Sequence, residues 1–350
     1  MYIKRNISFK LVIRYAWIGI LQSFLWSSLI FTLYYFMGWH FIAIPFQPLS
    51  VIGIAVAFFT GFKNNQSYDR FWEGRKIWGG IVNTSRTFTN QVLNLITLED
   101  NEDIQDNKTP KVSIKEVKEY QKILVYRHIA WINALRLQLR QPSSFSFKEN
   151  KFVETLFDKH RENEFICQTT GLYVSYEENE DLKKRQNVAT HIIKNQAKQL
   201  KELKEKYKLM DGFDFSLLMN NLEECYTLQG KCERIKNTPF PRQYAYFSKV
   251  FTYIFIFLLP FGLLDVFAGQ IKSEGLSSMY MFLIIPVSIL ISWMFITWET
   301  VGNSSEDPFE NKINDVPMSA LCRTIEIDLL DMLDETNLPP KVQPKDNILY

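Results

Sequence analysis

Residues 51–86 read VIGIAVAFFTGFKNNQSYDRFWEGRKIWGGIVNTSR. An apolar run of transmembrane character passes here into charged and aromatic residues, and no proline or paired glycine intervenes before Gly79-Gly80. Proline and glycine are the residues that most readily break a helix. We therefore predict one helix that leaves the bilayer and continues into the cytosol.

The apolar half of this helix carries a stripe of large side chains, Ile54, Phe58 and Phe62. A helix turns about 100° per residue, so each step of four residues drifts by only about 40° and the three share a face. Repeated around a symmetry axis, the stripe would form three stacked apolar rings, which can gate ions by excluding water. The competing interpretation is an ordinary stripe against lipid or a neighbouring helix.

Composition weighs against several classes of protein. The formal net charge is +2 and no basic tract is present, so we predict no nucleic-acid partner. The motifs HExxH, GxSxG, GxGxxG and the Walker loop are absent, which argues against an enzyme. The four histidines do not cluster and the four cysteines lie outside metal-type spacing. We predict free thiols facing a reducing cytosol, no metal and no cofactor.

Four segments are long and apolar enough to cross about 30 Å of hydrocarbon. They are Tyr15–Trp39, Phe46–Phe62, Tyr246–Phe267 and Met279–Trp298. We expect Pro260 and Pro286 to kink the last two. Lysine and arginine precede the first span and follow the second, whereas residues 40–45 contain neither. This asymmetry predicts a multi-pass protein of the cell (inner) membrane with both termini cytoplasmic.

The long connection between spans two and three reads as mostly helix. Helical spacing of apolar residues predicts helices at Val112–Leu139, Asp181–Met210 and Phe215–Ile235, with loop or extended chain at Glu99–Asp106 and Pro339–Tyr350. The spacing of Leu321, Ile325, Leu329 and Met332 predicts an amphipathic docking helix, in which Cys322 is inert.

The predicted fold class is therefore an all-α membrane protein, in which four transmembrane helices are continuous with a helical cytosolic domain. We predict four parts along the chain. Residues 1–62 hold the N-terminal segment with transmembrane helices 1 and 2, and 63–243 the helical cytosolic domain. Residues 244–300 hold transmembrane helices 3 and 4, and 301–350 a C-terminal cytosolic helix and tail.

Three blocks of sequence stand out: GFKNNQSYDRFWEGRKIWG after an apolar helix, GKCERIKNTPFPRQYAY before the third span, and DPFENKINDVPMSALCRTIEIDL after the fourth. Together they resemble the bacterial bestrophin family. In this order and at these distances, the blocks span nearly the whole chain.

The resemblance implies a homopentameric, barrel-like ion channel in the lipid membrane, whose second membrane helix lines a central pore. Ile54, Phe58 and Phe62 match the three apolar positions of the family's pore neck and would form the gate. The family also has a second aperture, which we expect near the start of the helix containing Ser216–Leu222. The channel would pass small monovalent ions: chloride or other anions by resemblance, with cations possible in bacterial members.

One departure from the family concerns calcium. Calcium-gated animal members carry an acidic clasp, and the corresponding stretch here runs from Asp307 to Asp315 with Lys312 inside it. Calcium needs six to eight oxygen ligands, and lysine supplies none. We therefore predict no physiologically tight calcium site.

Two other functions are consistent with a membrane protein of this kind. A secondary ion transporter would show saturable, concentrative uptake, whereas a channel collapses gradients. A membrane-anchored helical scaffold would show no flux. The prolines of spans three and four have no ionisable residue beside them at mid-membrane depth, which disfavours a transporter site.

Overall fold

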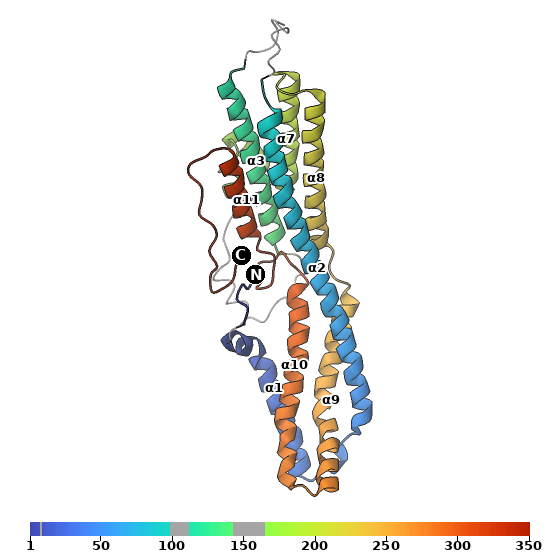
Figure 1. The fold of residues 1–350 in the computed structure, drawn as a ribbon. Helices are drawn as coiled ribbons and strands as arrows, with labels where there is room; N and C mark the ends of the chain where they lie inside the picture. The colour runs from blue at the N-terminus through green and yellow to red at the C-terminus, as the bar shows by residue number, and fades with distance from the viewer. Residues whose placement is uncertain (8, 99–111, 143–164) are drawn as a thin grey trace.

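The fold is described from a computed structural model, over residues 1–7, 9–98, 112–142 and 165–350. The molecule is elongated, with a bundle of helices at each end (Figure 1). The bundle that holds the long apolar helices is called here the apolar bundle, and the other the charged bundle. In the described residues the β-pairing is confined to isolated bridges, Tyr2 with Ile348 and Lys345 with Ile348. The prediction of an all-α fold is confirmed.

Helix α2 (Phe46–Leu95) runs through both bundles and joins them (Figure 1). Its 50 residues make a rod of about 75 Å. The predicted single helix is confirmed, and it continues through Gly79-Gly80. A Cβ atom on Gly80 would lie 2.9 Å from Leu228 Cδ2 of the neighbouring helix. A side chain at position 80 would therefore have to displace Leu228, so the close approach of that helix favours glycine.

The apolar bundle consists of α1 (Phe9–Tyr35), the first half of α2, α9 (Arg242–Glu274) and α10 (Ile284–Ser305). Short 3₁₀ turns, His40–Ile42 and Ser278–Leu283, lie in the connections at its far end. Its core holds residues such as Leu49, Phe255 and Leu259. Within the described part of the chain, four helical stretches are long and apolar enough to cross a membrane.

One expectation for this bundle is corrected. Pro286 lies in the first turn of α10, because the chain from Ser278 to Leu283 forms a separate 3₁₀ turn. The amide that proline lacks has no helical partner in a first turn, so Pro286, the third residue of α10, fits there and need not kink the helix. Pro260 does lie inside α9, as predicted.

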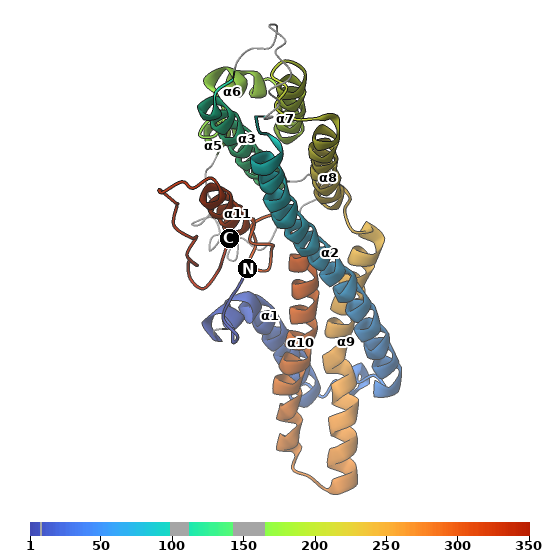
Figure 2. The ribbon, with the colours of Figure 1, turned by 45° about the horizontal axis from the view of Figure 1, so that its top comes forward.

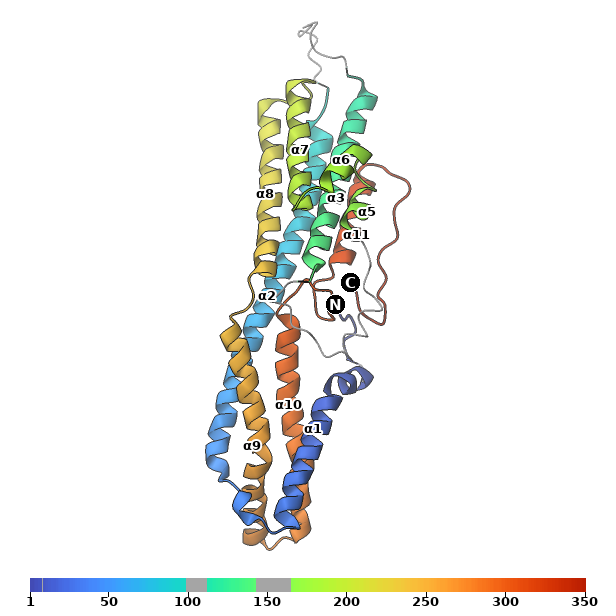
Figure 3. The ribbon, with the colours of Figure 1, turned by 180° about the vertical axis from the view of Figure 1, so that it is seen from behind.

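The charged bundle consists of the second half of α2, α3 (Ile114–Arg140), α7 (Val188–Glu205), α8 (Gly212–Asn237) and α11 (Met318–Met332). Two short helices, α5 (Ile166–Thr170) and α6 (Tyr176–Leu182), lie beside α3 and α7 (Figures 2 and 3). Its core is one cluster of buried residues that includes Trp78, Trp131 and Ile325. The indole Nε1 of Trp131 donates to Gln229 Oε1 at 3.0 Å.

The predicted helix Asp181–Met210 is wrong as a single element. Helix α6 ends at Leu182 and α7 begins at Val188, because Asn187 caps the new helix by accepting from the amide of Thr190 at 3.0 Å. The predictions for α3 and α8 hold to within a few residues. The acidic stretch Glu99–Asp106 lies outside the described residues. The tail from Pro339 has no helix, as expected, and it turns at Asp346 and Asn347 so that Lys345 pairs with Ile348.

Helix α11 docks on the charged bundle as predicted. Ile325 and Leu329 are buried there, and Cys322 is buried beside them. Burial also raises the pKa of the Cys225 and Cys232 thiols far above its usual value, so both stay protonated.

Candidate ion pathway along helix α2

Helix α2 has two opposite faces. On the apolar bundle side it buries Val56, Thr60, Lys63 and Ser67 against α9 and α10. Ile54, Phe58 and Phe62 centre about 170° away on an ideal helix. They are 71%, 74% and 47% exposed in the single chain. The three predicted neck residues therefore share one exposed face, called here the open face, and the ring of Phe62 at its edge contacts that of Tyr244 of α9, with centroids 6.3 Å apart.

Exposure alone does not single out this stripe. Helix α1 presents Leu21, Leu25 and Leu29 at the same spacing, each about half exposed. The two stripes differ in how they continue along the chain. The α2 stripe passes without a change of face into exposed polar and aromatic residues, whereas α1 ends at Tyr35. The continuation consists of Asn65, Asp69, Trp72, Lys76, Asn83, Thr87, Asn90 and Asn94.

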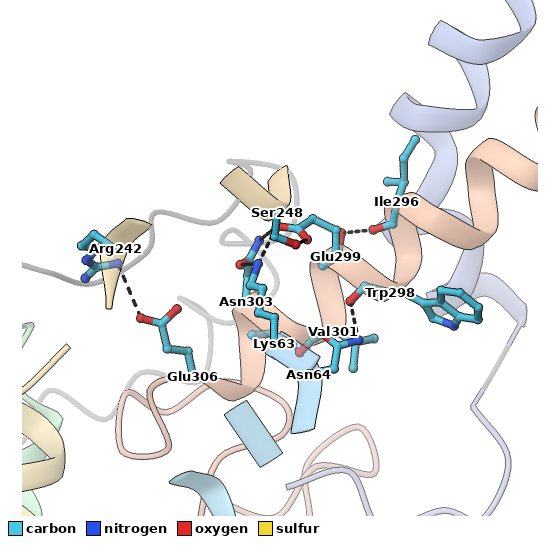
Figure 4. Close-up of polar contacts among 12 residues, drawn as sticks. Lys63, Asn64, Arg242, Ser248, Ile296, Trp298, Glu299, Val301, Asn303 and Glu306 are labelled. Carbon is cyan, nitrogen blue, oxygen red and sulfur yellow. Dashed lines mark hydrogen bonds and ion pairs between the residues drawn. The ribbon is translucent and has the colours of Figure 1, made fainter. Parts of the chain in front are cut away.

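Lys63 comes directly after Phe62 but points away from the open face. Its side chain is 1% exposed, and Nζ lies 2.5 Å from Glu299 Oε1 and 2.5 Å from Asn303 Oδ1, both on α10. Ser248 of α9 donates to the other oxygen of Glu299 at 3.1 Å. Figure 4 shows these side chains converging from three helices. The charge beside the neck residues is thus neutralised inside the protein.

Sequence reasoning missed the partners of Lys63. The available signal was that Glu299, like Lys63, stands near the charged end of an apolar run. Two opposite charges at the same depth of a bundle favour a pair. The neighbouring Asn64 binds the same helix, since its Nδ2 donates to Trp298 O at 3.1 Å (Figure 4).

Arg70 and Trp78 of α2 are engaged inside the protein. Arg70 donates to the carbonyl oxygens of Glu306 and Ile235, each at 2.9 Å. Trp78 is buried in the core of the charged bundle. Trp72 differs, because it is 48% exposed on the open face.

Glu310, in the acidic loop after α10, has both carboxylate oxygens beside lysines. Each carboxylate oxygen of Glu310 lies 3.2 Å from an ammonium, one from Lys236 and one from Lys312. Burial raises the pKa of Asp307, and raises that of Asp315 to about 7. Cationic partners and protonated carboxyls both reduce affinity for calcium. It remains a prediction that micromolar calcium leaves channel currents unchanged in a titration of the purified protein.

Ser216–Leu222, near which the second aperture is expected, lie in the first half of α8. Leu218 and Leu222 are buried there, whereas Ser216 and Asn220 are exposed. The residue that would narrow the aperture stays a prediction.

Comparison with known proteins gives a family match and several relatives. Residues 10–331 match the family described as Bacterial/Fungal Bestrophin protein. The voltage-dependent anion channel-forming protein YneE of Salmonella typhi is 31% identical over 85% of this chain and 80% of its own length. YneE of Escherichia coli K12 is 30% identical over 93% of this chain and 89% of its own.

The fold also matches solved structures. A bacterial bestrophin homologue from Klebsiella pneumoniae superposes with a TM-score of 0.71 at 24% identity, over 91% of this chain and 99% of that one. At that identity the structure supports the fold alone. Together with the match along residues 10–331, these findings establish that the chain belongs to the bacterial and fungal bestrophin family.

Proposed function

We propose that this protein is a homopentameric ion channel in which five copies of α2 surround a central pore. Ile54, Phe58 and Phe62 form its neck and gate. The observation that carries the proposal is the open face of α2, which is apolar over about three turns and then polar to its end. A face of this kind suits a water-excluding constriction followed by a wet vestibule.

The proposed ions are small and monovalent. Relatives with about 30% identity are named anion channel-forming proteins, which supports chloride or another anion. The proposed setting is the cell (inner) membrane, with the charged bundle and both termini in the cytoplasm. The charged bundle would then be the cytosolic domain, and the boundaries at residues 62, 243 and 300 would mark the membrane surfaces and the connections between spans.

The test is to replace the three neck residues together with alanine and record currents in planar bilayers. Smaller side chains widen and wet the constriction, so unitary conductance should rise. The matched control replaces Leu21, Leu25 and Leu29 of α1, which have the same chemistry and spacing on another exposed face. Equal conductance in both triple variants would refute the neck assignment.

A liposome flux assay separates the channel from the other functions. A channel lets a preformed ion gradient collapse. A transporter would instead accumulate its substrate with saturation, and a scaffold would leave the gradient intact.

A further inference from the structure

Two charged residues lie on the open face of α2 beyond the neck. Asp69 and Lys76 are both exposed. On an ideal helix they lie about 60° and 40° from Ile54, within the arc that Phe58 and Phe62 define. Neither makes an ion pair with any residue that the structure describes.

Most other charges of α2 are held away from this face. Lys63 is buried against Glu299. Glu73 pairs with Arg234 of α8, and Arg86 pairs with Asp328 of α11. Between Phe46 and Lys76, the open face therefore presents Asp69 and Lys76 as its ionised groups.

We propose that Asp69 and Lys76 are specificity-determining residues of the channel. The inference rests on the proposed pentameric pore. Five copies of Asp69 would form an acidic ring about 10 Å beyond Phe62, and five copies of Lys76 a basic ring about 10 Å further. Rings of like charge attract ions of opposite sign and repel the others, and the neck carries no fixed charge of its own. The balance of the two rings thus sets the preference between anions and cations.

Removing either ring should shift the ratio of anion to cation permeability in a fixed direction, whichever ion the native channel prefers. Asp69→Asn removes the acidic ring, so the ratio of anion to cation permeability should rise, on the order of threefold to tenfold at low salt. Lys76→Gln should lower the ratio by a similar factor. The double variant should return toward the native ratio, because both fields are lost together.

The experiment measures reversal potentials of the reconstituted full chain under a KCl gradient. Asp69→Glu keeps the charge and should keep the native ratio, which separates charge from side-chain shape. Arg75→Gln makes the same charge change as Lys76→Gln at a half-buried position off the open face, and Glu205→Gln makes that of Asp69→Asn on the surface of α7. Both controls should leave the ratio within error of native. The shifts from the two rings should shrink in high salt, since the Debye length falls to about 3 Å at 1 M.

The failure of this inference is distinguishable from failure of the channel proposal. If the native protein conducts and the neck variant alters conductance, but Asp69→Asn and Lys76→Gln leave the reversal potential unchanged, the two rings do not face the pathway. Shifts of the wrong sign would overturn the inference equally. If the native protein carries no current, the pore itself is refuted.

Discussion

At the scale of single residues, the buried pair of Lys63 and Glu299 shows how a charge can lie beside the proposed apolar neck without facing the proposed pathway. The two side chains are 1% and 7% exposed. Desolvating an ammonium and a carboxylate costs several kcal/mol each, and that cost is offset only while both are present and hydrogen-bonded. The burial of these two charges is therefore tolerated only while both residues are present.

Removing one partner should be more harmful than removing both. We expect Lys63→Met to lower the free energy of unfolding by about 3–5 kcal/mol, because it leaves the carboxylate of Glu299 buried and unpaired. The double variant with Glu299→Met should regain most of the loss. Thermal unfolding in detergent, followed by tryptophan fluorescence, measures both.

The matched control for this pair is Lys201→Met on α7. Lys201 and Glu205 form an exposed pair at 3.7 Å, so the loss should stay below about 1 kcal/mol. If the single and double variants at positions 63 and 299 lost equal free energy of unfolding, packing and not charge would account for the destabilisation.

Asp315 gives the protein a stability that depends on pH. Burial raises its pKa from 3.8 to about 7, so between these values the folded chain holds a proton that the unfolded chain releases. Its contribution is complete below about pH 4 and is lost as the pH rises through about 7. We expect the melting temperature of the native protein to fall from pH 5 to pH 8 relative to that of Asp315→Asn. Parallel melting curves over this range would contradict the assignment.

At the scale of elements, contacts between helices explain a glycine pair that the sequence alone leaves ambiguous. Gly79-Gly80 in a long helix suggests a break, yet α2 passes through it. The close approach of Leu228 on α8 explains Gly80. The same helix pair gives the next prediction.

We expect Gly80→Val to destabilise the protein by about 1–3 kcal/mol, because the added side chain must displace Leu228. Gly230→Ala is the control on the partner helix. Nothing lies within 4 Å of the position its Cβ would take, and alanine favours a helix over glycine, so stability should rise by about 0.5–1 kcal/mol. Chemical denaturation measures both; a neutral Gly80→Val would show that α8 can move aside.

Sequence patterns predicted the long helices well because each one repeats apolar residues over several turns. They failed where a single local interaction decides, as at the Asn187 cap that separates α6 from α7. Periodicity also placed Ile54, Phe58 and Phe62 on one face. It could not identify Glu299 as the partner of Lys63, since the pairing depends on how α10 is rotated against α2, 236 residues away.

At the scale of the whole molecule, the single chain leaves a polar and apolar face of α2 uncovered from one bundle to the other. A pentamer would enclose that face around an axis. We expect native mass spectrometry in mild detergent to give five times the mass of the chain. The neck alanine variant should keep this mass, because the proposed neck side chains line the pathway and not the contacts between subunits; a monomer would favour a transporter or a scaffold.

Helix α2 is one unbroken helix from the proposed neck to Leu95. About 37 residues separate Phe58 from that far end, a distance of about 55 Å. A tilt of about 5° pivoting near Phe58 would swing the distal tip by about 5 Å while the fulcrum stays almost still. A tilt of this kind would therefore displace Leu95 much farther than Phe58. A spectroscopic label near Leu95 would then report motions that are too small to detect at the proposed neck.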